Sequence, residues 1–200
     1  MTPIFPTAYF GNISYYKALF SFDAILIESN ETYVKQSIRN RCEIVGANGL
    51  QQLSIPVTKI NGSKTKTNSI VLSNETDWKK LHWKAIETAY APSPYFEHYC
   101  EDVRRLIFQE ENNLLQFNTN IHEQIINWLG IKTSSQFTSE YMQIPLEFDF
   151  RNKFNKGEKE STNSLIKYTQ VFENEIGHKD NLSILDAIFC LGPMARTLID

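Results

Sequence analysis

The hydrophobic pattern of this chain changes its period once, near Asn74. Up to residue 72 the apolar residues form short runs between turn residues, which predicts strands with one short helix. From there to residue 130 they recur about every 3.6 residues, which predicts helices. The sequence therefore predicts an α/β fold, with α+β as the alternative. A small mixed sheet from the N-terminal part would pack against a helical central region, followed by a C-terminal strand and helix.

The first 27 residues predict a βαβ unit. Residues 5–10 are expected to form an opening strand or loop, and residues 13–20 carry apolar side chains at helical spacing. Residues 24–27 are a short continuous apolar run, which is typical of a strand buried on both faces. Strand, helix and strand within so short a segment indicate the βαβ motif.

A β-hairpin is the next predicted element. Residues 38–45 lead into a Gly-Ala-Asn-Gly turn at positions 46–49, and residues 50–57 lead out of it. Asn-Gly is a strong hairpin signal because both residues adopt positive φ at little cost. A second turn is expected at residues 61–63, and a further strand at residues 69–73.

Three helices are predicted between residues 74 and 130. The first begins after Asn74 or Thr76 and ends at Pro92 and Pro94. The second is expected over residues 95–109 and the third over residues 113–129, closed by a glycine. The apolar stripe of the first helix consists of Trp78, Leu81, His82, Ala85, Ile86 and Ala89.

The C-terminal part is less regular. Residues 148–164 are mostly polar without an apolar period, and we expect a flexible surface loop there. A strand is predicted at residues 165–172, followed by a helix at residues 182–191 that Asp180 or Asn181 would cap. The whole chain, residues 1–200, is predicted to be a single domain.

Charge and composition exclude several classes of function. The formal charge is −3, with 20 Lys and Arg against 23 Asp and Glu, so a large basic face for DNA or RNA is not expected. No signal peptide and no membrane span are predicted. The three cysteines, Cys42, Cys100 and Cys190, are far apart and are expected in the core of a protein of the reducing cytoplasm. No metal site and no cofactor are predicted, since the chain lacks metal-ligand spacing and nucleotide-binding glycine motifs.

The densest polar cluster predicts an anion site. In an extended segment, Lys35, Ser37, Arg39 and Arg41 would share one face because side chains alternate along a strand. Such a face would bind a phosphate or carboxylate, which arginine holds with two parallel hydrogen bonds. The alternative is a solvated edge strand whose charges prevent aggregation.

His82 is the candidate for proton transfer. It lies on the apolar stripe of its predicted helix, where a histidine is either a hydrogen-bonded core residue or a general acid or base. The other histidines show no metal spacing. Both interpretations of His82 stay open at this stage.

An ordered set of segments resembles the WbqC-like protein family, in the short form found in Bacteroidota. The segments that carry the resemblance are residues 7–10, 15–16, 33–42, 46–49, 53–57, 78–82, 90–96, 168–172 and 181–193. The chain departs from longer relatives at Pro6-Thr7-Ala8-Tyr9, where they carry a His-Gln-Pro-type motif. Positions that match the family pattern are Lys35, Asn40, Arg41, Trp78, His82, Tyr90 and Tyr95.

The resemblance implies a bacterial cytoplasmic protein, in some members linked to surface-polysaccharide synthesis with a suggested glycine-transferase role. The first hypothesis is thus a transferase acting on a phosphorylated or nucleotide-linked precursor, with His82 as the catalytic base. Its predicted substrate-binding residues are Lys35, Asn40, Arg41, Arg39, Tyr9, Tyr90, Tyr95 and Gln170. The second hypothesis is a non-catalytic binding or assembly module with a protein partner.

Overall fold

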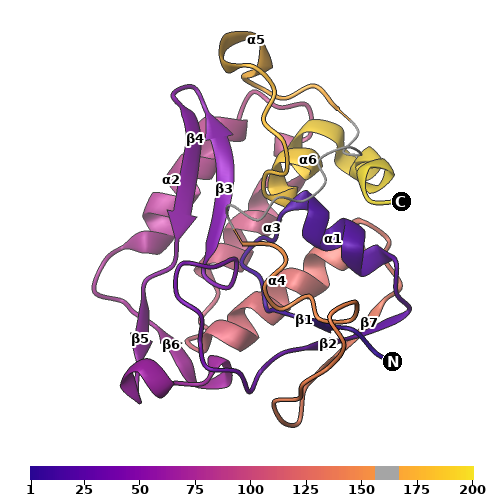
Figure 1. Cartoon of the computed structure of the whole chain (residues 1–200). Coiled ribbons are helices and arrows are strands. Elements are labelled where there is room, and N and C mark those ends of the chain that lie inside the picture. The colour runs from indigo at the N-terminus through magenta and orange to yellow at the C-terminus, as the bar shows by residue number, and fades with distance from the viewer. Residues whose placement is uncertain (156–166) are drawn as a thin grey trace.

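A computed structural model describes residues 1–155 and 167–200 of the chain (Figure 1). Two N-terminal strands and one later strand form a three-stranded parallel sheet in the order β1 (Ile4–Phe5), β2 (Ala24–Ile27) and β7 (Ser134–Phe137). Helix α1 (Ile13–Phe20) connects β1 to β2, which confirms the predicted βαβ unit. The Asn12 side chain caps α1 by accepting a hydrogen bond from the Tyr15 backbone N–H.

Two antiparallel strand pairs follow the sheet. Strands β3 (Arg41–Gly46) and β4 (Gly49–Ser54) form the predicted hairpin, closed by a two-residue turn. Gly49, the first residue after the turn, has φ 103°, whereas Asn48 does not adopt the positive φ that the Asn-Gly signal predicted. Strands β5 (Val57–Lys59) and β6 (Ile70–Leu72) form the second pair, with two short 3-10 helices, Gly62–Lys64 and Thr67–Ser69, between them.

The helical layer consists of α2 (Trp78–Tyr90), α3 (Phe96–Phe108) and α4 (Leu114–Trp128), as the 3.6-residue period predicted. The hairpin packs on α2 through β3 (Figure 1). Two members of the predicted stripe are not buried: Leu81 is 64% exposed, and Ala85 is half-buried. Tyr90, four residues after Ile86, is fully buried and extends the stripe.

The C-terminal part contains α5 (Glu173–Ile176), α6 (Ile184–Leu191) and a closing 3-10 helix, Gly192–Leu198. Ser183 caps α6 in place of the predicted Asp180 or Asn181. Residues 167–172, the described part of the predicted C-terminal strand, form no strand, and residues 165 and 166 lie outside the described residues. The third strand of the sheet is β7, which the sequence did not indicate.

The described half of the predicted 148–164 loop is anchored to the sheet. The Ile4 backbone N–H donates to the Phe148 carbonyl, and Ile4 forms a bridge with Asp149. Arg151 and Phe154 are buried. The remainder of the predicted loop lies outside the described residues.

The core lies between the sheet, the hairpin and the helices, and is rich in aromatic side chains. Tyr9, Tyr15, Tyr16 and Phe117 are almost completely buried within it. Helices α1 and α6 pack against each other on one side of this core (Figure 1). Cys42 and Cys190 are buried as predicted, whereas Cys100 is only half-buried, and all three are free thiols. In the described ranges, no helix combines the length and apolar character needed to cross a bilayer.

Candidate functional site

The predicted cationic segment is not a strand. Residues 35–40 form successive turns, with Gln36 at φ 55°. The Ser37 hydroxyl donates to the Val34 carbonyl, and the Asn40 backbone N–H donates to the Ser37 carbonyl. Such local hydrogen bonds compete with strand pairing. The expected alternation of Lys35, Ser37, Arg39 and Arg41 on one face is therefore wrong.

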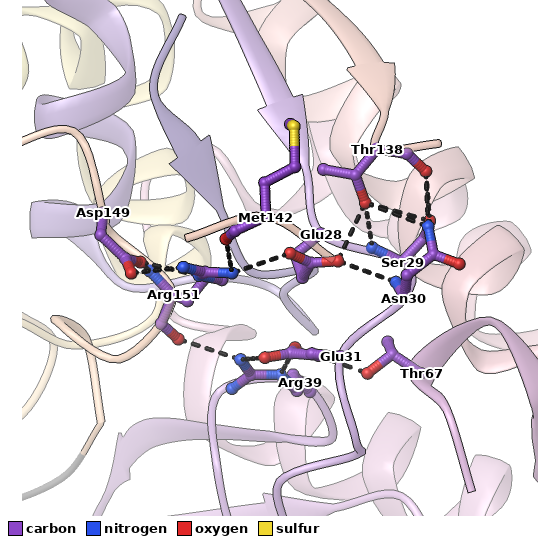
Figure 2. A network of polar contacts seen from close by, with 10 residues as sticks. All are labelled: Glu28, Ser29, Asn30, Glu31, Arg39, Thr67, Thr138, Met142, Asp149 and Arg151. Atoms are coloured by element: carbon purple, nitrogen blue, oxygen red, sulfur yellow. Dashed lines mark hydrogen bonds and ion pairs between the residues drawn. The ribbon is translucent and has the colours of Figure 1, made fainter. Parts of the chain in front are cut away.

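Arg39 is fully buried and holds an ion pair, so the structure does not place it in an exposed anion site. Its Nε donates to Glu31 Oε1 at 2.6 Å and its Nη2 to Glu31 Oε2 at 2.8 Å. Nη2 also donates to the Arg151 carbonyl at 3.0 Å (Figure 2). Burial raises the pKa of the Glu31 carboxyl, and the Arg39 charge works against this shift. From its buried position Arg39 thus ties residues 35–40 to Glu31 and to the backbone of Arg151.

A second buried arginine extends this network to the sheet (Figure 2). Arg151 Nη1 lies 3.1 Å from Glu28 Oε2, and its Nη2 lies 2.6 Å from Asp149 Oδ2. Glu28 follows β2, and it also accepts a hydrogen bond from Thr138, which follows β7. The two arginines therefore tie the carboxyl ends of two parallel strands to residues 31–39 and 149–151.

Lys35 and Arg41 do come together, at an open pocket of about 390 Å³ that we call the cationic pocket. Its lining consists of Tyr33, Lys35, Gln36, Asn40, Arg41, Ser54, Ile55, Pro56, Val57 and Lys59. Three of these side chains are cationic, and none of the described lining residues is acidic. Partial desolvation and the nearby charge of Lys35 lower the pKa of the Lys59 ammonium. The pocket is therefore an electropositive hollow on a protein of net negative charge.

The positions of the cations are set by their neighbours. Arg41 Nε donates to the Ser54 hydroxyl at 3.2 Å across the first pair of the β3–β4 ladder. Lys59 Nζ lies 5.3 Å from the centre of the Tyr33 ring, which is a cation–π contact. Lys35 is exposed at the tip of the turn segment. Guanidinium and ammonium groups thus border the pocket from two strands and one turn.

Asn40 is a buried member of the pocket wall. Its Nδ2 donates to the Ile55 carbonyl at 2.9 Å, and its own carbonyl accepts from the Ile55 backbone N–H at 2.8 Å. Its Oδ1 is buried and has no hydrogen-bond partner. Asn40 therefore fixes the wall and keeps one free acceptor.

His82 lies behind this wall and is not among the lining residues. It is 5% exposed, its ring contacts Trp78, and its Nδ1 lies 2.9 Å from the Tyr9 hydroxyl. Burial lowers the pKa of the His82 imidazole to about 4, against the effect of a hydrogen bond with the Ser54 backbone. Because Ser54 lines the pocket, its backbone joins His82 to the pocket wall. Tyr9 is fully buried beside His82 and also does not line the pocket.

Three other predicted site residues lie near helix α6. Tyr90 donates to Asp186 Oδ1 at 2.9 Å, and Gln170 Nε2 donates to Asp186 Oδ2 at 3.2 Å. Tyr168 completes this cluster by donating to Asp186 Oδ2 at 2.5 Å. Burial raises the pKa of the Asp186 carboxyl, and its hydrogen bonds oppose the shift. Tyr95 packs against Gly192 at the end of α6.

The structure therefore places the predicted site residues in separate groups. Lys35, Asn40 and Arg41 share the cationic pocket, while Tyr90 and Gln170 surround Asp186. Sequence analysis missed Lys59, whose place depends on the pairing of β5. It also missed Asp186, although a carboxylate within an apolar helical run is itself a sign of a buried polar cluster. Within the described ranges, no three His, Cys, Asp or Glu side chains gather as a metal site.

Comparison with known proteins gives one family. The model of the WbqC-like protein family matches residues 7–156. The uncharacterized protein Rv1507c of Mycobacterium tuberculosis (strain ATCC 25618 / H37Rv) is 29% identical over 120 residues, which are 60% of this chain and 52% of that protein. The chain thus spans about half the length of this curated relative. No solved structure matches the chain. All residues of the cationic pocket fall within the matched range, whereas Gln170 and Asp186 do not.

Proposed function

The chain belongs to the WbqC-like protein family, and from this premise we propose that it binds an anionic small molecule in the cationic pocket. We further propose that it is a cytoplasmic transferase acting on a phosphorylated or nucleotide-linked precursor in bacterial surface-polysaccharide synthesis, with a glycine-transferase-like role. The observation that carries the proposal is the set of Lys35, Arg41 and Lys59 around one hollow without an acidic neighbour in its described lining.

The chemistry of the lining supports an anion as the ligand. Like charges that converge on one site repel each other, and an anion placed among them removes this repulsion. The Arg41 guanidinium offers several donors in a plane, and Lys35 and Lys59 add point charges. The volume of about 390 Å³ falls in the range of small-molecule sites, roughly 300–1,000 Å³. A phosphate or diphosphate group suits this arrangement.

In this proposal His82 acts as a positioning residue. With its pKa near 4, the imidazole is neutral at pH 7 and is a weak base. Its hydrogen bonds link Tyr9 on one side to the Ser54 backbone on the other. His82 would thereby hold the strand end against which Arg41 is placed, without itself touching the substrate.

The alternative is a non-catalytic binding module, and one observation favours it. The described lining of the cationic pocket contains no His, Asp or Glu, the side chains that most often transfer protons. A module that only binds an anion or an anionic segment of a protein partner needs no such group.

Calorimetric titration with inorganic phosphate, a nucleoside diphosphate and nucleoside diphosphate sugars tests the proposal. We expect saturable binding that Arg41→Gln weakens by about tenfold or more, since hydrogen bonds to charged groups contribute roughly 1.5–3 kcal/mol. Lys35→Gln and Lys59→Gln should weaken it as well. Lys64→Gln is the matched control, because Lys64 is an exposed lysine outside the pocket. Binding that none of the three pocket variants weakens would remove the cationic pocket from the proposal.

A turnover assay distinguishes the transferase from the non-catalytic binding module. Incubation of the protein with a bound sugar nucleotide and candidate amine or hydroxyl acceptors should yield a transfer product if the protein is a transferase. His82→Gln should then raise KM for the donor more than it lowers kcat, because it loosens the strand end that positions Arg41. Binding without any product, together with capture of one stoichiometric protein partner, would support the binding module.

A further inference from the structure

A second hollow adjoins the cationic pocket at Gln36 and Arg41, which line both. We call it the amide pocket; its volume is about 240 Å³. The amide side chains of its described lining are Asn12, Gln36, Gln52, Asn155 and Asn181. These residues come from segments far apart in the chain, where strand β3 packs against α6 and α6 packs against α1 (Figure 1).

Backbone strain is concentrated in the wall of this pocket. Within the described ranges, the residues other than glycine with positive φ are Phe10 at 42°, Gln36 at 55° and Asn181 at 54°. All three line the amide pocket. Side chains with a Cβ avoid this conformation for steric reasons, and residues that keep it cluster at active sites and ligand clamps. Their convergence on one hollow indicates a binding site there.

Two of the amides present oriented donors at the pocket. Asn12 Oδ1 accepts from the Tyr15 backbone N–H at 3.0 Å. Asn181 Oδ1 accepts from the Ser14 backbone N–H at 2.9 Å. These bonds fix which end of each amide is the nitrogen. Both side chains are half-buried, and among the described residues neither Nδ2 is enclosed or donates to another group, so each keeps an accessible N–H pair.

The charges of the amide pocket cancel. Arg41 and Lys153 contribute positive charges, and Glu43 and Asp180 contribute negative charges. The cationic pocket, by contrast, has three cations and no carboxylate in its described lining. An anion is therefore favoured in the cationic pocket, and the amide pocket favours a neutral polar group. Hydroxyl groups suit it, because they both donate and accept, as do the amides around them.

We propose that the two pockets bind one sugar phosphate, with the phosphate in the cationic pocket and the sugar in the amide pocket. The inference rests on the proposed function, because the anion must occupy the cationic pocket. The Nδ2 groups of Asn12 and Asn181 donate to sugar hydroxyls, and the Asp180 carboxylate accepts from one. Gln36 and Arg41 lie where the pockets meet and bind the phosphate end of the sugar. The volume of about 240 Å³ is below the roughly 300–1,000 Å³ of drug-sized ligands and suits one sugar ring.

Calorimetric titration with inorganic phosphate and with the 1-phosphates of glucose, galactose and mannose tests the sugar subsite. We expect at least one hexose phosphate to bind about tenfold more tightly than phosphate, since its hydroxyls add hydrogen bonds. Phosphoethanolamine, which places an ammonium group beside the phosphate, should bind no more tightly than phosphate. Hexose phosphates that bind only as well as phosphate, or tighter binding of phosphoethanolamine, would overturn the sugar subsite alone. Failure of all these ligands to bind would overturn the anion site as well.

Two variants place the sugar in the amide pocket. Asn12→Thr keeps an oxygen that caps α1 but removes the amide donor. It should weaken hexose phosphate binding about three- to tenfold and leave inorganic phosphate binding unchanged. Asn113→Thr is the matched control, because Asn113 caps α4 in the same way and lies outside both pockets.

Gln36→Gly removes an amide and relieves the positive φ at the same position. It should weaken hexose phosphate binding without lowering the melting temperature, as expected where strain is kept for binding. Hexose phosphate affinity that both Asn12→Thr and Gln36→Gly leave unchanged would assign the sugar to another place on the protein.

Discussion

At the scale of single residues, two arginines two positions apart in the sequence have opposite environments. Arg39 is fully buried and forms two hydrogen bonds with Glu31, whereas Arg41 is half-buried and borders the cationic pocket. A charge pattern along the sequence treats the two alike. The two environments differ because of the partner. Arg39 is buried in an ion pair with the Glu31 carboxylate, whereas the Arg41 guanidinium is left for solvent or a ligand.

We predict that Arg39→Met destabilises the protein by about 3–5 kcal/mol, because it leaves the Glu31 carboxylate buried without its partner. Urea unfolding followed by circular dichroism measures the loss. Arg41→Met is the matched control and should change the free energy of unfolding by less than about 1 kcal/mol. The double variant Glu31→Leu/Arg39→Met should recover much of the loss. Equal effects of Arg39→Met and Arg41→Met would mean that the buried ion pair contributes no more to the free energy of unfolding than the exposed arginine does.

The same variant has a defined pH dependence. The pKa of Glu31 is already raised by burial, and loss of the Arg39 charge moves it further upward. A carboxyl whose pKa is raised in the folded state favours folding at low pH, and this contribution is lost as the pH rises through the folded pKa. The deficit of Arg39→Met should therefore be smaller at pH 5 than at pH 8. A deficit that grows toward low pH would contradict this interpretation.

At the scale of elements, the sequence predicts those whose signals are local. Helices α1 to α4 and the β3–β4 hairpin follow from apolar spacing and one Asn-Gly turn, and each was confirmed, although Asp77 and not Asn74 or Thr76 is the N-cap of α2. Strand β7 was missed because its sequence, Ser-Ser-Gln-Phe, has no apolar run or alternation. Its place is set by pairing with β2, more than 100 residues earlier in the chain. An extended conformation was considered for residues 35–41, and the turns at residues 35–40 were missed, because side-chain hydrogen bonds that form turns leave no periodic pattern.

The junction of α6 with the closing 3-10 helix depends on a glycine. Gly192 has φ 57°, and a Cβ added to it would lie 2.4 Å from the Tyr95 ring. Gly130, past the end of α4, has a similar φ of 62°, but its added Cβ would meet only the end of the Arg196 side chain at 2.9 Å. We predict that Gly192→Ala costs about 2–4 kcal/mol, from backbone strain plus overpacking, and Gly130→Ala about 1 kcal/mol.

Thermal unfolding of the two alanine variants compares these junctions directly. Tyr95→Leu in the Gly192→Ala background should recover part of the stability, since it removes the ring that the new methyl group meets. Equal losses for the two glycine variants would show that backbone conformation alone matters and that the contact with Tyr95 does not.

At the scale of the whole molecule, contacts distant in sequence assemble the candidate site, and this is why its composition was predicted only in part. Tyr9 meets His82 across 73 positions, and Tyr90 meets Asp186 across 96. The residue types at these positions indicated polar interactions, and each of these side chains forms a buried hydrogen bond. Their grouping into a cationic pocket, a buried histidine and a carboxylate cluster depends on how the hairpin, α2 and α6 pack, which no local pattern encodes.

Two buried histidines should also set the acid stability of the whole molecule. Burial lowers the pKa of His82 and of His122 to about 4 each, from an ordinary value near 6.5. Between these values the unfolded chain binds protons that the folded protein does not, so stability falls as the pH decreases from about 6.5 to 4. At pH 4.5 each histidine should lower the free energy of unfolding by about 2–3 kcal/mol relative to pH 7. The raised pKa values of Glu31 and Asp186 act in the opposite direction and reduce this slope.

Urea unfolding at intervals from pH 4.5 to pH 7.5 measures the slope. The wild-type free energy of unfolding should rise with pH, because two buried imidazoles outweigh the opposing carboxyls. In the His82→Gln/His122→Gln variant that rise should vanish or reverse, since only the carboxyl contributions remain. His98→Gln is the matched control because it removes an exposed imidazole in place of a buried one. A double variant that keeps the full wild-type slope would show that other groups cause the loss of stability in acid. It would also mean that His82 and His122 are protonated in the folded protein, although both are buried against aromatic rings.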